Sequence, residues 1–143
     1  MISVKKLIYK IVNRLYYVPT YGAITGGIFE DKQLNSVTGT WQNIGTITLP
    51  AGVWLVYLMA SFAQNTSGVR QLTIGDTSTS AGVVIRTARV APANGAATTV
   101  QLNCPLQGGN TYYVNGAQNS GSKLTVQTRY TAVKIGEDTS SVS

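Results

Sequence analysis

Short alternating segments separated by turn residues constrain the fold of this chain more than any other feature. Apolar and polar residues alternate in runs that end at Gly, Pro, Asn or Asp, as is typical of strands that bury one face. We expect about eight strands at regular spacing. The clearest runs are Thr40–Leu49, Val53–Phe62, Val69–Ile74, Val83–Ala91, Thr98–Leu106, Thr111–Val114 and Lys123–Ile135, with Asn115-Gly116 as a turn. The predicted fold class is an all-β, antiparallel jelly-roll sandwich with a short N-terminal α-helix.

The strand expected over Val53–Phe62 is apolar on both faces. One face is typical of a core and consists of Trp54, Val56, Leu58, Ala60 and Phe62. The other consists of Val53, Leu55, Tyr57, Met59 and Ser61, and it is also mostly apolar. A domain of this size has no third layer to cover that second face. We therefore expect an identical subunit to cover it.

The first eighteen residues contain the clearest helical pattern in the chain. Apolar residues recur at intervals of four and three, which is a heptad seam, and Pro19 ends the pattern. The seam residues are Val4, Ile8, Ile11 and Leu15, and basic side chains occupy other faces at Lys5, Lys6, Lys10 and Arg14. Three such helices would form a coiled coil, or each would dock separately on a partner. We divide the chain into this arm (1–20), a linker (21–39), a jelly-roll domain (40–136) and a flexible tail (137–143).

Charge and composition exclude several classes of function. The net charge is +6, but four of the positive charges lie in the arm, so the rest of the chain is nearly neutral and nucleic-acid binding is not expected. No histidine and only five acids are present, so we expect no catalytic site, no metal site and no cofactor. Charged residues make up 11% of the chain, about half the usual share, which favours a durable extracellular or virion protein. Polar residues interrupt residues 1–18, so we expect no signal peptide, no membrane span and synthesis in the host cytoplasm.

Three motifs resemble those of the tumour necrosis factor-like and complement globular-head jelly rolls, especially versions on bacteriophage tail and head fibres. They are Leu49-Pro50-Ala51-Gly52-Val53-Trp54-Leu55-Val56, Leu106-Gln107-Gly108-Gly109-Asn110-Thr111-Tyr112-Tyr113-Val114 and Gln118-Asn119-Ser120-Gly121, the last of which precedes a strand that ends at Ala132-Val133-Lys134-Ile135. The resemblance covers residues 40–136, about two thirds of the chain. It implies a homotrimer with Tyr57, Tyr112 and Tyr130 near the threefold axis. The acids that bind calcium in the family have no clear counterpart here.

These observations predict a non-enzymatic trimeric virion protein, the head of a phage tail fibre or tail tip. The arm would contact other virion proteins, and the domain would bind a host-surface receptor, most simply a saccharide. Candidate receptor-binding loops surround Asn65, Asn94 and Asn119. The predicted trimer interface contains Val53, Leu55, Tyr57, Met59, Tyr112 and Tyr130. Two alternatives remain open: a capsid decoration or head-fibre protein, and a cytokine-like extracellular ligand.

Overall fold

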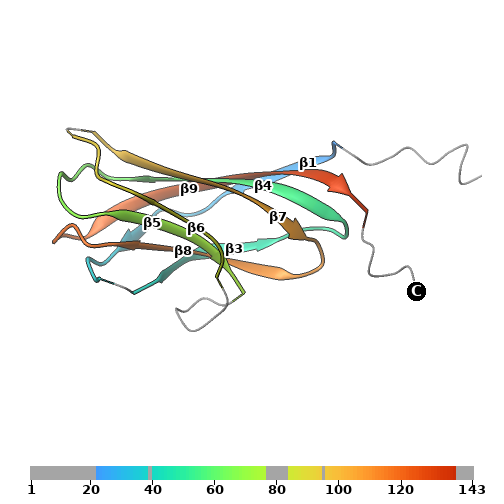
Figure 1. Cartoon of the computed structure of the whole chain (residues 1–143), viewed down its shortest axis with the longest axis horizontal. Coiled ribbons are helices and arrows are strands. Elements are labelled where there is room, and N and C mark those ends of the chain that lie inside the picture. The colour runs from blue at the N-terminus through green and yellow to red at the C-terminus, as the bar shows by residue number, and fades with distance from the viewer. Residues whose placement is uncertain (1–21, 39, 77–83, 95, 138–143) are drawn as a thin grey trace, which may run out of the picture.

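The computed structural model describes residues 22–38, 40–76, 84–94 and 96–137, which form two packed antiparallel sheets (Figure 1). The predicted all-β antiparallel sandwich is confirmed, whereas the predicted N-terminal helix and residues 138–143 of the predicted tail lie outside the described residues. None of the described segments is a helix long and apolar enough to cross a membrane. The strands are β1 (Ile24–Ile28), β2 (Lys32–Leu34), β3 (Gln42–Thr48), β4 (Val53–Phe62), β5 (Arg70–Gly75), β6 (Val84–Val90), β7 (Thr98–Gln107), β8 (Thr111–Gln118) and β9 (Leu124–Gly136).

The strand order is that of a jelly roll. One sheet runs β1-β9-β4-β7, with β2 also paired to β9, and the other runs β3-β8-β5-β6. The described chain begins and ends at one end of the sandwich, where the Gly22 amide donates to the Lys134 carbonyl at 2.9 Å. We call this the entry end. We call the opposite end the loop end. Phe62 pairs with Thr98 and Arg70 pairs with Gln118, so the strands that these residues begin or end all reach this end of the sandwich. The connections there are 63–69, 91–97 and 119–123.

The core lies between the two sheets and is centred on β4. The inward side chains of β4 are all buried, as the alternation of its sequence predicts, and Val56, Ala60 and Phe62 are 0% exposed. They pack with inward residues of β3, β5, β7 and β8, including Ile47, Leu72, Val100 and Val114. Outward residues of β4 stay partly or fully exposed, so β4 has one buried face in the single chain.

Residues 21–39, predicted to be a linker, instead contain two edge strands. β1 pairs with residues 129–133 of β9 and β2 pairs with residues 124–126, so together they form one interrupted edge. Phe29 lies at the interruption and turns into the sandwich, where its ring occupies the space above Gly45 that a side chain would fill. The linker prediction was wrong because exposed edge strands need little apolar alternation, and glycines in the segment resemble loop residues.

The predicted turn at Asn115-Gly116 is also wrong, because both residues lie inside β8. A Cβ on Gly116 would come within 2.7 Å of Leu34 Cδ1 and 2.9 Å of Ile44 Cδ1, so this glycine permits close packing. Asn115 is 2% exposed and accepts a hydrogen bond from the Asn43 side chain at 3.2 Å. Asn115 and Gly116 indicate a turn in the sequence alone, but in the structure a hydrogen bond and close packing inside the sandwich explain why these two residue types are present.

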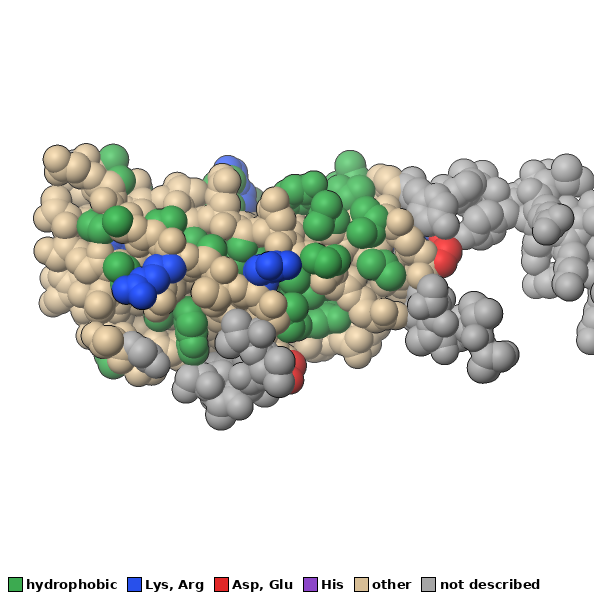
Figure 2. Space-filling model, in the orientation of Figure 1, with side chains coloured by type: hydrophobic (Ala, Val, Ile, Leu, Met, Phe, Trp, Pro, Cys, Tyr) green, Lys and Arg blue, Asp and Glu red, His purple; other side chains and the backbone are tan. Residues whose placement is uncertain are grey.

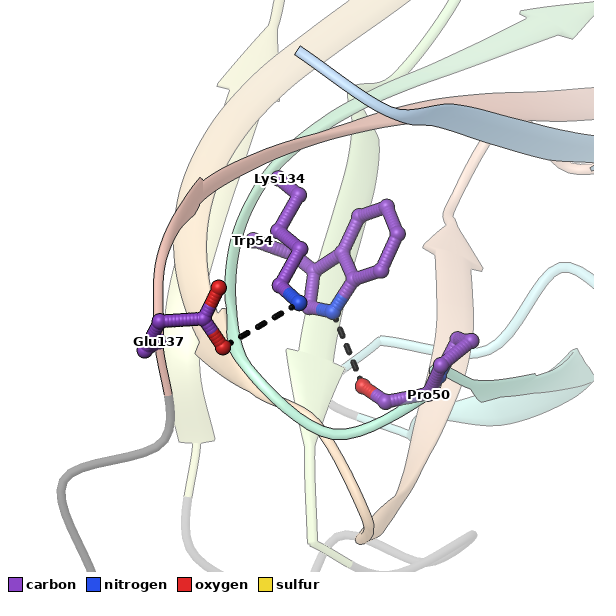
Figure 3. Close-up of polar contacts among 4 residues, drawn as sticks. All are labelled: Pro50, Trp54, Lys134 and Glu137. Atoms are coloured by element: carbon purple, nitrogen blue, oxygen red, sulfur yellow. Dashed lines mark hydrogen bonds and ion pairs between the residues drawn. The ribbon is translucent and has the colours of Figure 1, made fainter. Parts of the chain in front are cut away.

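Two of the motifs quoted above meet at the entry end. The indole of Trp54 donates to the Pro50 carbonyl at 2.8 Å, which closes the turn between β3 and β4 (Figure 3). The amides of Gly108 and Gly109 donate to the carbonyls of Gly52 and Leu49, at 2.7 and 2.9 Å. A Cβ on Gly108 would collide with the Pro50 carbonyl oxygen. Beside this corner Lys134 forms an ion pair of 3.4 Å with Glu137 (Figure 3).

Arg70 is a buried cation at the loop end. Its side chain is 0% exposed and donates to the carbonyls of Asn65 and Ser67, at 2.9 and 2.8 Å, and more weakly to that of Val69. Its Nε has no hydrogen-bond partner, and burial lowers the pKa of the guanidinium. Arg70 therefore holds the connection between β4 and β5 by binding three backbone carbonyls with one planar group.

Gly108→Ala should destabilise the fold strongly, because the new methyl group would overlap backbone atoms that cannot rotate away. We expect a loss of about 1–3 kcal/mol in the free energy of unfolding, measured in urea at fixed protein concentration. Gly136→Ala is the matched control, since its Cβ would meet only the Val53 side chain, at ordinary contact distances of 3.5 Å to Cβ and 3.8 Å to Cγ2. Equal stabilities of the two variants would contradict the close approach of Gly108 to the Pro50 carbonyl.

Arg70→Lys should destabilise the chain more than Arg70→Met. A buried lysine either keeps its charge without a counter-charge or gives up a proton, and both cost free energy, and its ammonium lacks the planar fork with which Arg70 donates to the Asn65 and Ser67 carbonyls. Methionine loses the same hydrogen bonds but removes the buried charge. We expect Arg70→Lys to cost about 2 kcal/mol in urea unfolding. A lysine variant as stable as the parent chain would show that the three carbonyl contacts contribute little.

Candidate interaction surface

The outer face of the β1-β9-β4-β7 sheet carries apolar side chains that no part of the described chain covers. The pairing of β1 with β9, β9 with β4 and β4 with β7 aligns one outward residue of each strand with those of its neighbours. We call each such set of aligned residues a row. The row nearest the entry end that crosses all four strands is apolar throughout and consists of Ile24, Val133, Leu55 and Pro105. Ile24 is 72% exposed and the neighbouring Ile135 is 51% exposed. Figure 2 views the sandwich from the side of β6 and β7, not onto this outer face, and shows hydrophobic side chains in the half of the molecule toward the entry end.

The next rows toward the loop end become more polar. The second row consists of Gly26, Thr131, Tyr57 and Asn103, and the third of Ile28, Arg129, Met59 and Gln101. Tyr57, Met59, Gln101, Asn103 and Arg129 line a shallow hollow of about 250 Å³. Tyr57 is 45% exposed and Ile28 is 85% exposed. An aromatic ring and an aliphatic side chain this open to water are typical of a surface that another molecule covers.

The structure brings together four of the six predicted interface residues. Val53, Leu55, Tyr57 and Met59 share the outer face of β4, as predicted from the alternation of residues. Tyr112 does not join them, because it lies in the opposite sheet, is 8% exposed, and donates through its hydroxyl to the Gln107 carbonyl at 2.7 Å. Tyr130 is also displaced: it is in register with Leu58, faces inward, and packs on Phe29 with ring centres 5.7 Å apart.

Sequence reasoning missed other residues of this face. Ile24, Ile28, Val133, Pro105 and Arg129 were not predicted to belong to it, mainly because residues 21–39 were interpreted as a linker. Ile24 and Ile28 are four positions apart with Gly26 midway, which is the spacing of one strand face. That spacing is the only sequence signal that could have placed them beside β9.

The three candidate receptor-binding loops gather at the loop end, but two of the three asparagines have structural roles. Asn65 Oδ1 accepts from the Ser67 amide at 2.8 Å, which is a local turn bond. Asn119 Oδ1 accepts from the Val69 amide at 2.7 Å and ties two connections together. Asn94 is exposed, and no hydrogen bond of its side chain is found within the described part of the chain.

Two kinds of reactive group were tested among the described residues, a metal-binding cluster and an activated cysteine. They contain no group of three or more His, Cys, Asp or Glu side chains that could hold a metal ion. Cys104 is 1% exposed, and burial raises the pKa of its thiol, while Arg86 partly opposes that shift. A reactive cysteine needs an accessible thiol with a lowered pKa, so Cys104 is a core residue.

No protein-family model matches this sequence, and neither does any curated protein sequence. Solved structures do resemble the fold. A tumour necrosis factor, Eiger from S. frugiperda, is 8% identical with a TM-score of 0.52, covering 82% of this chain and 96% of that one. The globular domain of zebrafish complement 1qA is 12% identical with a TM-score of 0.51, covering 80% of this chain and 98% of that one. The chain therefore has the jelly-roll fold of tumour necrosis factor-like and complement globular-head proteins.

Proposed function

We propose that this chain is a non-enzymatic bacteriophage virion protein that assembles as a homotrimer through the outer face of the β1-β9-β4-β7 sheet. The proposal rests above all on the uncovered apolar row Ile24, Val133, Leu55 and Pro105. The low charge content and the motifs that resemble phage-fibre jelly rolls support a place on a virion. The trimer would form the head of a tail fibre or tail tip.

The two ends of the sandwich suit different partners. Gly22 and Glu137 lie at the entry end, so the basic arm is connected to the domain there and would contact other virion proteins. The loop end is opposite to the end at which Gly22 lies, and it presents Asn94 and the exposed residues Gln64, Thr66 and Ser122. We propose that these polar side chains face the host receptor. Amide and hydroxyl groups of this kind can hydrogen-bond a saccharide, which makes a host-surface saccharide the simplest ligand.

Leu55→Asp should dissociate the trimer. Light scattering of the parent chain should give three times the 15.2 kDa chain mass, and the variant should approach a single chain mass at the same concentration. The cause is an unpaired carboxylate placed in the centre of the apolar row, where the interface would exclude water.

Ile85→Asp is the matched control for this prediction. Ile85 is 40% exposed on β6, in the opposite sheet, so a carboxylate there should leave the mass unchanged. Far-ultraviolet circular dichroism would verify that both variants keep the fold. A monomeric parent chain, or dissociation by both substitutions alike, would contradict the proposed interface.

A chain shortened to begin at Gly22 should remain a trimer. It retains β1 and β2, whose removal would expose the edge of β9 and the Phe29 contact with the core. The measurement is again the solution mass over a range of dilutions. Loss of the trimer in this shortened chain would make the arm, not the sheet face, the trimerising element.

A further inference from the structure

A hollow of about 190 Å³ lies on the outer side of the β3-β8-β5-β6 sheet, close to the loop end. It is separate from the surface proposed for the trimer, which belongs to the other sheet. Three stretches of chain meet there, with β6 beside them: residues 37–38 before β3, residues 69–71 at the start of β5, and residues 118–119 at the end of β8.

Two aligned outward residues supply polar side chains to this hollow. Gln71 of β5 pairs with Arg89 of β6 on one side and with Ala117 of β8 on the other. The next residue of β5, Leu72, is buried in the core, so Gln71 and its partners point outward. Both Arg89 and Gln71 line the hollow, and they reach it side by side.

Hydrogen bonds to the end of β8 fix the rest of the hollow. The Val37 amide donates to the Gln118 carbonyl at 3.0 Å. The Gln118 side chain is 1% exposed and donates to two backbone carbonyls, at 2.9 and 2.7 Å. Asn119 Oδ1 accepts from the Val69 amide at 2.7 Å. The backbone around the hollow is therefore held in place within the single chain, which lowers the entropy cost of binding a ligand.

The donors that line the hollow are left for a ligand. Within the described part of the chain, the side chains of Arg89, Gln71 and Thr38 form no hydrogen bond or ion pair. Val37 lies beside Thr38, and its aliphatic side chain is 44% exposed. The hollow thus combines a guanidinium, an amide, a hydroxyl and an apolar contact.

Positive charge surrounds the hollow. Arg89 is exposed at its rim, and Arg70, which precedes Gln71, is buried with its charge bound only to backbone carbonyls. Asp76 is the only described acid next to a strand of this sheet, and it lies at the opposite end of β5. The other described acids are next to strands of the first sheet: Glu30, Asp31 and Glu137. A concave surface with cations and no adjacent acid attracts anions.

These groups suit a sugar ring that carries an acidic group. The guanidinium of Arg89 presents parallel N–H groups that match two oxygens of one carboxylate or sulfate. The Gln71 amide and the Thr38 hydroxyl can bond ring hydroxyls, and Val37 can contact the C–H side of the ring. Pockets for drug-sized ligands measure about 300–1,000 Å³, so a hollow of 190 Å³ holds one sugar residue of a longer chain.

We propose that this hollow binds one anionic sugar residue of the host-surface saccharide, with Arg89 on its carboxylate or sulfate and with Gln71 and Thr38 on its hydroxyls. The inference rests on the proposed saccharide receptor and names the chemical class of that saccharide. It does not depend on the trimer, because the hollow is built by a single chain.

Titration of the full-length chain with monosaccharides, followed by ligand-observed NMR, tests the class of ligand. Glucuronate, galacturonate or N-acetylneuraminate should bind at least about tenfold more tightly than glucose and galactose, because only the acidic sugars bond the guanidinium. Glucose 6-sulfate distinguishes a sulfate from a carboxylate as the acidic group. Acetate, a carboxylate without a ring, should bind at least about tenfold more weakly than the best acidic sugar.

Substitution of Arg89 tests the location of the site. Arg89→Gln should weaken binding of the best acidic sugar by at least about tenfold and leave the weak binding of glucose unchanged. Arg89→Lys should be intermediate, because it keeps the charge and loses the planar fork. Lys123→Gln is the matched control: it removes an exposed charge at the loop end but outside the hollow, so affinity should change by less than about twofold. Far-ultraviolet circular dichroism would verify the fold of each variant.

The possible failures separate this inference from the proposed receptor. Equal affinities for acidic and neutral sugars would overturn the anionic class and leave a saccharide receptor in place. Equal losses in Arg89→Gln and Lys123→Gln would replace the hollow by general attraction of charge. Acetate bound as tightly as the acidic sugars would show an anion site that does not recognise a sugar. Failure of an array of neutral and acidic glycans alike would refute the saccharide receptor itself.

Discussion

Strand β4 is paired with β9 on one side and with β7 on the other over all ten of its residues, and every other feature of the structure is placed relative to it. Because side chains alternate between faces, a shift of one residue in this strand would expose Trp54 and Phe62 and bury Tyr57. The buried face of β4 is therefore sufficient to fix the register of its neighbours. The same register aligns Leu55 with Val133 and Pro105, so the apolar outer row is a direct consequence of how the core is built.

The strands that bury an alternating face could be predicted from sequence, and those that lack such a face could not. β4 and β7 begin at the predicted residues because alternation and turn residues agree there. β1 and β2 were missed because an edge strand is held by the backbone of β9, and backbone pairing leaves no pattern in the side chains. In β8 the Asn115-Gly116 pair was misread because the packing of Leu34 and Ile44 against Gly116 comes from distant segments.

The candidate surface was predictable in part for the same reason. Alternation placed Val53, Leu55, Tyr57 and Met59 on one face, but it could not say which other strands complete that face. Tyr112 and Tyr130 were predicted to lie in the interface because they are aromatic, but both side chains turn toward the core. Residue type alone therefore does not identify interface residues. Arg70 shows the same limit for charge: an arginine in a strand is usually solvated, and only the carbonyls of the β4–β5 connection explain its burial.

The three motifs that resemble known jelly rolls form hydrogen bonds that close connections at the two ends of the sandwich. The Pro50–Trp54 turn and the Gly108-Gly109 turn bind each other at the entry end, and the Gln118 side chain binds the Leu34 and Ser122 carbonyls at the loop end. Trp54 and Gln118 supply side-chain donors to these contacts, and Gly108 and Gly109 supply backbone amides. All of these contacts lie within the single chain, so they explain how the motifs stabilise the fold and do not identify a binding partner. The exposed rows of the sheet and the loops are the surfaces left for a partner, and Tyr57, Arg129 and Asn94 are exposed there in the single chain.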